Sequence, residues 1–255
     1  EVLFDKMTFT KMNGKLIVKD GKVDMTNLSM NTMGGSVVMN GYYSTADPKK
    51  PEMNAGFRME NIGFAQAYKA LDMVQQMAPI FENLKGNFSG NMHIRTLLDN
   101  QMSPVMDTMQ GNGSLSTQDL SLSGVKVIDQ IAEAVKKPEL KEMKVKDMTL
   151  DFTIKDGRVS TKPFDIKLGD YVMNLSGSTG LDQTIDYSGK IKLPASAGDI
   201  AKLTTLDLKI GGTFSSPKVS LDTKSMTNQA VEAVTDKAVS YTHLRSHETG
   251  AYLVC

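Results

Sequence analysis

The sequence contains very little cysteine and no tryptophan. Its only cysteine is Cys255, the last residue, so neither an intrachain disulfide nor a cysteine-based metal site can form. Aromatic residues make up 6% of the chain, whereas methionine occurs 18 times. Methionine is a flexible apolar side chain, so this composition is suited to adaptable apolar surfaces.

The chain also lacks an excess of charge and a long apolar run. Lys plus Arg number 29, as do Asp plus Glu, and no block of five basic residues indicates nucleic-acid binding. No run approaches the length of a transmembrane helix, and no signal peptide is present. Because the chain begins at Glu1 and enters strand-like sequence at once, we expect it to be an internal part of a longer protein.

Catalytic motifs are missing as well. Before residue 240 the only histidine is His93, on the polar side of a strand-like run, where a solvated side chain is favoured over a catalytic base. The sequence has no Gly-x-Ser-x-Gly elbow, P-loop or Gly-x-Gly-x-x-Gly. Acidic residues are scattered over turns and polar strand positions, which suits hairpins better than a glycosidase pair or a calcium loop; they include Asp20, Asp24, Asp151, Asp156, Asp165, Asp170, Asp182 and Asp186. We therefore expect no enzyme, no metal site and no cofactor.

Residues 240–255 differ in character from the rest of the chain. This segment is similar to translated read-through of sequencing-adapter DNA, a contaminant of assembled gene ends. It contains His243 and His247, followed by Glu248, a spacing compatible with metal ligands. We favour an artefact or a disordered terminus, and we assign the predicted fold to residues 1–239 alone.

The main signal in residues 1–239 is alternation of apolar and polar side chains. Leu150, Phe152 and Ile154 alternate with Asp151 and Thr153, for example, and similar runs occur throughout. A period of two residues is typical of strands with one buried face. An antiparallel sheet with one apolar face and one hydrated face is predicted.

Asp-Gly pairs divide these runs and reveal an internal repeat. Asp20-Gly21 and Asp156-Gly157 each separate two alternating segments, and an Asp-Gly pair favours a two-residue hairpin turn. The two pairs lie 136 residues apart, and the same offset aligns residues of about 14–45 with those of about 150–181 without gaps. We predict a repeated unit of strand, Asp-Gly turn, strand, glycine-containing turn and strand.

Three segments have helical spacing of apolar residues instead. They cover about 64–78, 128–135 and 225–239, and prolines at 79 and 138 follow the first two. The predicted fold is therefore mainly β: a long antiparallel sheet made of repeated hairpin units with three short helices.

The order of these elements resembles the C-terminal region of AsmA-like proteins. The likeness covers about residues 5–235 and is carried by residues 16–23, by Leu28-x-Met30, by residues 33–41 and by the closing segment 206–219, with its Gly-Gly-Thr-Phe and Ser-Pro. AsmA-like proteins lie in the envelope of Gram-negative bacteria. The resemblance implies that the sheet is strongly curved into a β-groove, whose apolar face carries phospholipid acyl chains toward the outer membrane in support of outer-membrane biogenesis. It also implies a periplasmic location and an inner-membrane helix elsewhere in the parent protein.

The apolar strand positions are the expected lipid-facing residues. They are Leu16, Val18, Met30, Val37, Met39, Phe152, Ile154, Phe164, Ile166, Met173, Leu175, Ile191, Leu206, Leu208 and Ile210. The expected partners are phospholipids and, through other parts of the parent protein, the inner and outer membranes. The alternative is a structural or interaction module of the envelope, in which the same residues form a closed core without lipid. Whether the apolar face is open or covered distinguishes the two.

Overall fold

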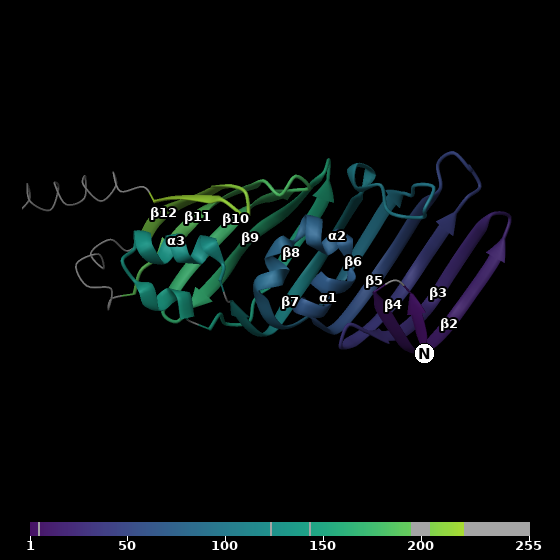
Figure 1. The fold of residues 1–255 in the computed structure, drawn as a ribbon, viewed down its shortest axis with the longest axis horizontal. Helices are drawn as coiled ribbons and strands as arrows, with labels where there is room; N and C mark the ends of the chain where they lie inside the picture. Colours follow the sequence, from purple (N-terminus) through teal and green to yellow (C-terminus); the bar gives the residue numbers. More distant parts are fainter. Residues whose placement is uncertain (5, 123, 143, 195–204, 222–255) are drawn as a thin grey trace, which may run out of the picture.

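Figure 1 shows the fold of the protein, a computed structural model. The structure describes residues 1–4, 6–122, 124–142, 144–194 and 205–221. The predicted helix at 225–239 and the segment 240–255 lie outside these residues. The description below concerns the described part of the chain.

The chain forms one antiparallel sheet of 13 strands, in which each strand pairs with its neighbour in the sequence. This mainly β, meandering sheet confirms the predicted fold class. Its strands are β1 (Val2–Phe4), β2 (Met7–Lys19), β3 (Lys22–Thr32), β4 (Gly35–Ser44), β5 (Glu52–Gly63), β6 (Leu84–Leu97), β7 (Gln110–Leu122), β8 (Thr149–Lys155), β9 (Arg158–Leu168), β10 (Tyr171–Gly180), β11 (Ile185–Lys192), β12 (Thr205–Gly212) and β13 (Pro217–Leu221).

The two Asp-Gly pairs form the predicted hairpin turns. Asp20 and Gly21 join β2 to β3 with φ of 50° and 70°, and Asp156 and Gly157 join β8 to β9 with φ of 50° and 68°. Two consecutive positive φ angles define the turn whose twist matches that of the flanking strands. Asp and Gly tolerate this conformation better than most residues.

The strand bounds repeat with the offset seen in the sequence. β3 begins at Lys22 and β9 at Arg158, which is 136 residues later, and the same difference separates both ends of β4 and β10. A bulge also recurs. Met25 pairs with Gly41 and Thr161 with Gly177, and in both hairpins the register shifts by one residue immediately afterwards.

The two recurring glycines allow the next strand to approach closely. A Cβ on Gly41 would lie 2.6 Å from Cα of Ala55, and a Cβ on Gly177 would lie 2.6 Å from Cα of Tyr187. Such distances leave no room for a side chain, so both repeats need glycine here.

The bulge in β3 and another in β5 bend the sheet along its length. Asn27 in β3 and Asn61 in β5 have φ of 48° and 56° at register shifts. Their backbone N–H groups donate to side chains of adjacent strands, at 2.7 Å to Oδ1 of Asn40 and at 2.9 Å to Oγ of Ser89. Bulges bend a strand and increase its local twist, and here the N–H groups they release are satisfied.

Short helices cover one face of the sheet (Figure 1). α1 (Phe64–Ala70) and α2 (Asp72–Met77) occupy the first predicted helical segment, and the extended backbone of Leu71 separates them. α3 (Lys126–Ala134) occupies the second. Three 3₁₀ segments are also present: η1 (Pro79–Asn83), η2 (Met106–Thr108) and η3 (Pro138–Glu142). In Figure 1, α1 and α2 lie over the middle of the sheet, and α3 lies over the end that contains β10–β12.

Candidate functional site

Paired residues of antiparallel strands lie on the same face, so the register identifies the apolar face of the whole sheet. One row across the middle pairs Met39 with Phe57, Phe57 with Met92, Met92 with Gly113 and Gly113 with Phe152. All the expected lipid-facing residues belong to this face. The predicted alternation therefore produces one continuous apolar face.

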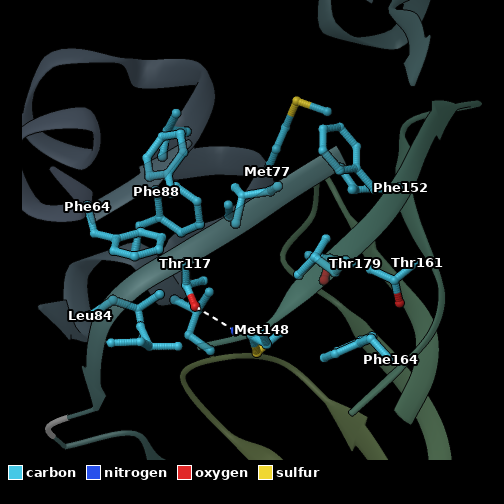
Figure 2. Close-up of a pocket in the computed structure, with 18 of the residues that line it drawn as sticks. Phe64, Met77, Leu84, Phe88, Thr117, Met148, Phe152, Thr161, Phe164 and Thr179 are labelled. Atoms are coloured by element: carbon cyan, nitrogen blue, oxygen red, sulfur yellow. Dashed lines mark hydrogen bonds between the residues drawn. The ribbon is translucent and has the colours of Figure 1, made fainter. Parts of the chain in front are cut away.

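A partly open cavity of about 360 Å³ lies between this face and the helices (Figure 2). Strands β5–β12 and α1–α3 all contribute to its wall, and no charged side chain of the described residues lines it. Its volume lies in the range of small-molecule sites, which are mostly apolar with a few polar groups. This cavity is the candidate functional site.

Aromatic rings form one wall of the cavity. Phe64 of α1, Phe81 of η1 and Phe88 of β6 pack against one another with ring centroids 4.8 to 5.5 Å apart. Figure 2 shows Phe64 and Phe88 on one side, and Thr161, Phe164 and Thr179 on the other. The aromatic cluster fixes α1 and η1 to the sheet, because offset and edge-to-face ring contacts stabilise such packing.

Another part of the wall is formed by α3 and by the segment before β8. Ile128 and Ile131 of α3 line the cavity together with Met148. Backbone N of Met148 donates to Oγ1 of Thr117 at 3.0 Å, and backbone N of Thr117 donates to O of Met148 at 2.9 Å. This pair of hydrogen bonds holds the segment against β7, which keeps the polar groups of Thr117 satisfied inside an apolar wall.

Methionine is frequent in the lining. The side chains are those of Met33, Met59, Met73, Met77, Met92, Met148 and Met173. Methionine has three rotatable bonds and a polarisable sulfur, so it adapts to ligands of different shape. The wall is therefore suited to a flexible apolar ligand rather than to one rigid shape.

A small polar cluster interrupts the apolar wall. Oγ1 of Thr179 and the hydroxyl of Tyr187 form a hydrogen bond of 3.1 Å, and Oγ1 of Thr161 donates to O of Gly177 at 3.4 Å. Burial raises the pKa of Tyr187, because the phenolate would lose its hydration. The phenol is therefore a neutral donor at physiological pH, and the cluster offers hydroxyl groups without charge.

The structure divides the expected lipid-facing residues among three environments. Seven line the cavity: Phe152, Ile154, Phe164, Ile166, Met173, Leu175 and Ile210. Five are buried in the core beside it: Met30, Val37, Ile191, Leu206 and Leu208. Met39 is half-buried on β4, and Leu16 and Val18 are exposed on β2, outside the cavity.

The two expected states of the apolar face, open and covered, therefore occur in different parts of the sheet. Near β11–β13 the face is buried in the core that includes α3, since Ile191, Leu206 and Leu208 are all below 4% exposed. In the middle it borders the cavity. At β2 it is open, with Leu16 at 56% and Val18 at 76% exposure.

Several lining residues were not expected from the sequence. They include the aromatic residues Phe64 and Phe88, and also Leu115 and Tyr187, which lie on the apolar face of the sheet. The omission has a physical cause in β6 and β7, where glycines occupy apolar-face positions and interrupt the hydrophobic alternation. The apolar residues that pair with those glycines on adjacent strands would have identified the face to which the glycines belong.

Comparisons with protein-family models, with curated proteins and with solved structures gave no match to this chain. Within residues 1–221, as far as the structure describes them, no helix is long and apolar enough to cross a membrane. The same residues contain no cluster of three or more His, Cys, Asp or Glu side chains that could hold a metal ion.

Proposed function

We propose that the cavity binds acyl chains of phospholipids, and that the chain is the periplasmic segment of an AsmA-like protein that conducts lipid along its apolar face in support of outer-membrane biogenesis. The observation that carries this proposal is the uncharged, methionine-rich lining of a cavity of about 360 Å³. The parent protein would reach the inner membrane through a helix elsewhere in its sequence. The resemblance to AsmA-like proteins supports the location and the cargo.

The chemistry of the lining fits this ligand. Acyl chains need apolar contact and no hydrogen-bond pattern, and each buried methylene contributes about 0.8 kcal/mol. Ten buried methylenes would contribute about 8 kcal/mol, which corresponds to micromolar binding before the entropy of association is subtracted. One hydroxyl of the pair Thr179 and Tyr187 donates to the other, so the pair can offer its remaining O–H to an ester or carboxyl oxygen at one end of the chain.

The alternative function is a structural or interaction module of the envelope without lipid. The observation that favours it is the burial of Met30, Val37, Ile191, Leu206 and Leu208, which lie in the core and do not line the cavity. In that case the cavity would be a packing defect beneath α1 and α2. Ligand binding distinguishes the two functions directly.

The first experiment uses the unchanged protein and saturated fatty acids of eight to sixteen carbons, which displace dansyl-undecanoic acid. We expect the affinity to rise about fourfold per methylene, the factor that corresponds to about 0.8 kcal/mol. An affinity that does not depend on chain length contradicts acyl-chain binding. Gentle purification followed by mass spectrometry then tests for bound phospholipid, and recovery of none from the parent protein contradicts the proposed cargo.

A charge in the cavity tests its location. Leu115 lines the cavity, whereas its neighbour Ser116 is exposed on the other face of β7. Leu115→Glu should weaken fatty-acid binding at least tenfold, because the ligand would desolvate the carboxylate. Ser116→Glu, the matched control, should leave binding unchanged. Equal effects of the two substitutions contradict this site, and circular dichroism verifies that both variants are folded.

A further inference from the structure

The outer edge of β2 is an incomplete part of the sheet. β3 pairs with β2 along most of its length, whereas on the other side β1 pairs only with Met7, Thr8 and Phe9. From Thr10 to Lys19, no strand of the described residues pairs with this edge. Unpaired strand edges carry free N–H and C=O groups and can accept another strand.

The internal repeat shows how the equivalent edge is completed elsewhere in the chain. β8 corresponds to β2, with Phe152 at the place of Leu16 and Ile154 at the place of Val18. In the second unit β7 pairs with this edge and sets Gly113 opposite Phe152 and Gly111 opposite Ile154. Ile154 is 5% exposed, whereas Val18 is 76% exposed. The difference follows from the presence of β7 and of the cover above it.

At the other end of the described sheet, a side chain covers the outer strand edge, which is not the case at β2. Gln130 of α3 places its side-chain amide on the outer edge of β13. There Nε2 donates to O of Pro217 at 3.0 Å, and Oε1 accepts from N of Val219 at 3.1 Å. The amide thereby takes the place of a neighbouring strand. No helix of the described residues makes such contacts with β2.

We propose that the edge of β2 from Thr10 to Lys19 binds an antiparallel strand with the side-chain pattern of β7, contributed by another sheet unit of this architecture. The direction of the added strand is inferred from β1, which pairs antiparallel with the start of β2, Val2 opposite Phe9. A strand that continues this pairing along the rest of β2 is also antiparallel to β2. Such strand addition uses backbone hydrogen bonds for affinity and alternate side chains for specificity. The incoming strand covers Leu16 and Val18 and extends the apolar face past β2.

The charged residues of β2 indicate which side chains the partner strand carries on its polar face. Lys15 pairs with Thr26 and Lys19 with Lys22, so both lysines lie on the face opposite to Leu16 and Val18. Polar or acidic residues of the partner fit there, because opposite charges on neighbouring strands attract and like charges repel. Two copies of this chain joined edge to edge through β2 would bring lysines together, which disfavours a second copy as the partner.

The test uses the full chain and a synthetic peptide with the sequence of β7, Gln110–Leu122. Amide hydrogen exchange is measured with and without the peptide. We expect exchange in residues 10–19 to slow at least tenfold at saturating peptide, while β8 stays unchanged. A peptide with proline at the position of Asn112 should have no effect, because proline removes a backbone donor.

Variants of exposed residues identify the face that the strand covers. The double substitution Leu16→Lys and Val18→Lys should abolish the protection. Ile17→Lys is the matched control, since Ile17 is 44% exposed on the opposite face, and it should retain the protection. The proposal is overturned if the peptide protects nothing, if both variants behave alike, or if protection of residues 10–19 rises with protein concentration in the absence of peptide.

Discussion

At the scale of single residues, glycine determines where strands can approach and where rings can lie. Gly113 on β7 faces Phe152 on β8, and a Cβ at Gly113 would lie 2.5 Å from Cζ of that ring and 2.6 Å from O of Asn91. The Phe152 ring covers the place where a side chain would otherwise project. The cavity wall at this point is therefore formed by an aromatic ring packed over bare backbone.

Substitution of this glycine should be costly. Gly113→Ala forces the ring and the carbonyl of Asn91 apart, and we expect a loss of about 1–3 kcal/mol in the free energy of unfolding. Gly56→Ala on β5 is the control, because its new methyl group would meet nothing nearer than 3.9 Å, and its effect should stay within about 0.5 kcal/mol. Urea denaturation measures both, and equal losses would contradict this account of Gly113.

At the scale of elements, α3 acts on the edge of a strand as well as on the core. Its apolar side buries Ile128, Ile131 and Ala132, and Gln130 makes the two hydrogen bonds to β13 described above. An edge strand without such cover tends to pair with other chains. We therefore expect the amide of Gln130 to reduce association of the protein through this edge.

A graded pair of substitutions tests this role of Gln130. Gln130→Ala removes both hydrogen bonds and should cost about 1–3 kcal/mol, at about 0.5–1.5 kcal/mol for each. It should also increase self-association in sedimentation velocity. Gln130→Glu keeps the acceptor for Val219 and loses the donor to Pro217, so an intermediate effect is expected. A Gln130→Ala variant with unchanged stability and unchanged sedimentation would contradict the proposed role.

The elements also show what sequence patterns can and cannot predict. The strands, the Asp-Gly hairpins and the repeat follow from local patterns, because alternation and turn chemistry act between near neighbours. The break at Leu71 could not be predicted, since the spacing from Phe64 to Ala78 is helical throughout. The contacts of Phe64 with Phe81 and Phe88 depend on tertiary packing, which no periodicity encodes, and the sequence therefore predicted only part of the cavity wall.

At the scale of the whole molecule, the two ends of the sheet differ in cover. Residues 11–20 are all exposed, whereas β10, β11 and β12 carry many of the buried side chains. Local stability depends on such burial. We expect amides of β2 and β3 to exchange about a hundredfold faster than those of β10–β12 in native-state hydrogen exchange. Uniform exchange across the sheet would contradict this gradient.

The neighbour-to-neighbour order of the strands governs how the molecule assembles and how it yields to force. Every strand pair in the sheet joins strands that are consecutive in the sequence. Pairing is therefore local along the chain, with the longest connections, from β5 to β6 and from β7 to β8, containing the helices, and local pairing favours rapid folding. Assembly can begin at any hairpin and spread in both directions, as in repeat proteins whose units contact only their neighbours. Under tension applied at one end, the same order lets the strands detach one after another, starting from the end that is pulled.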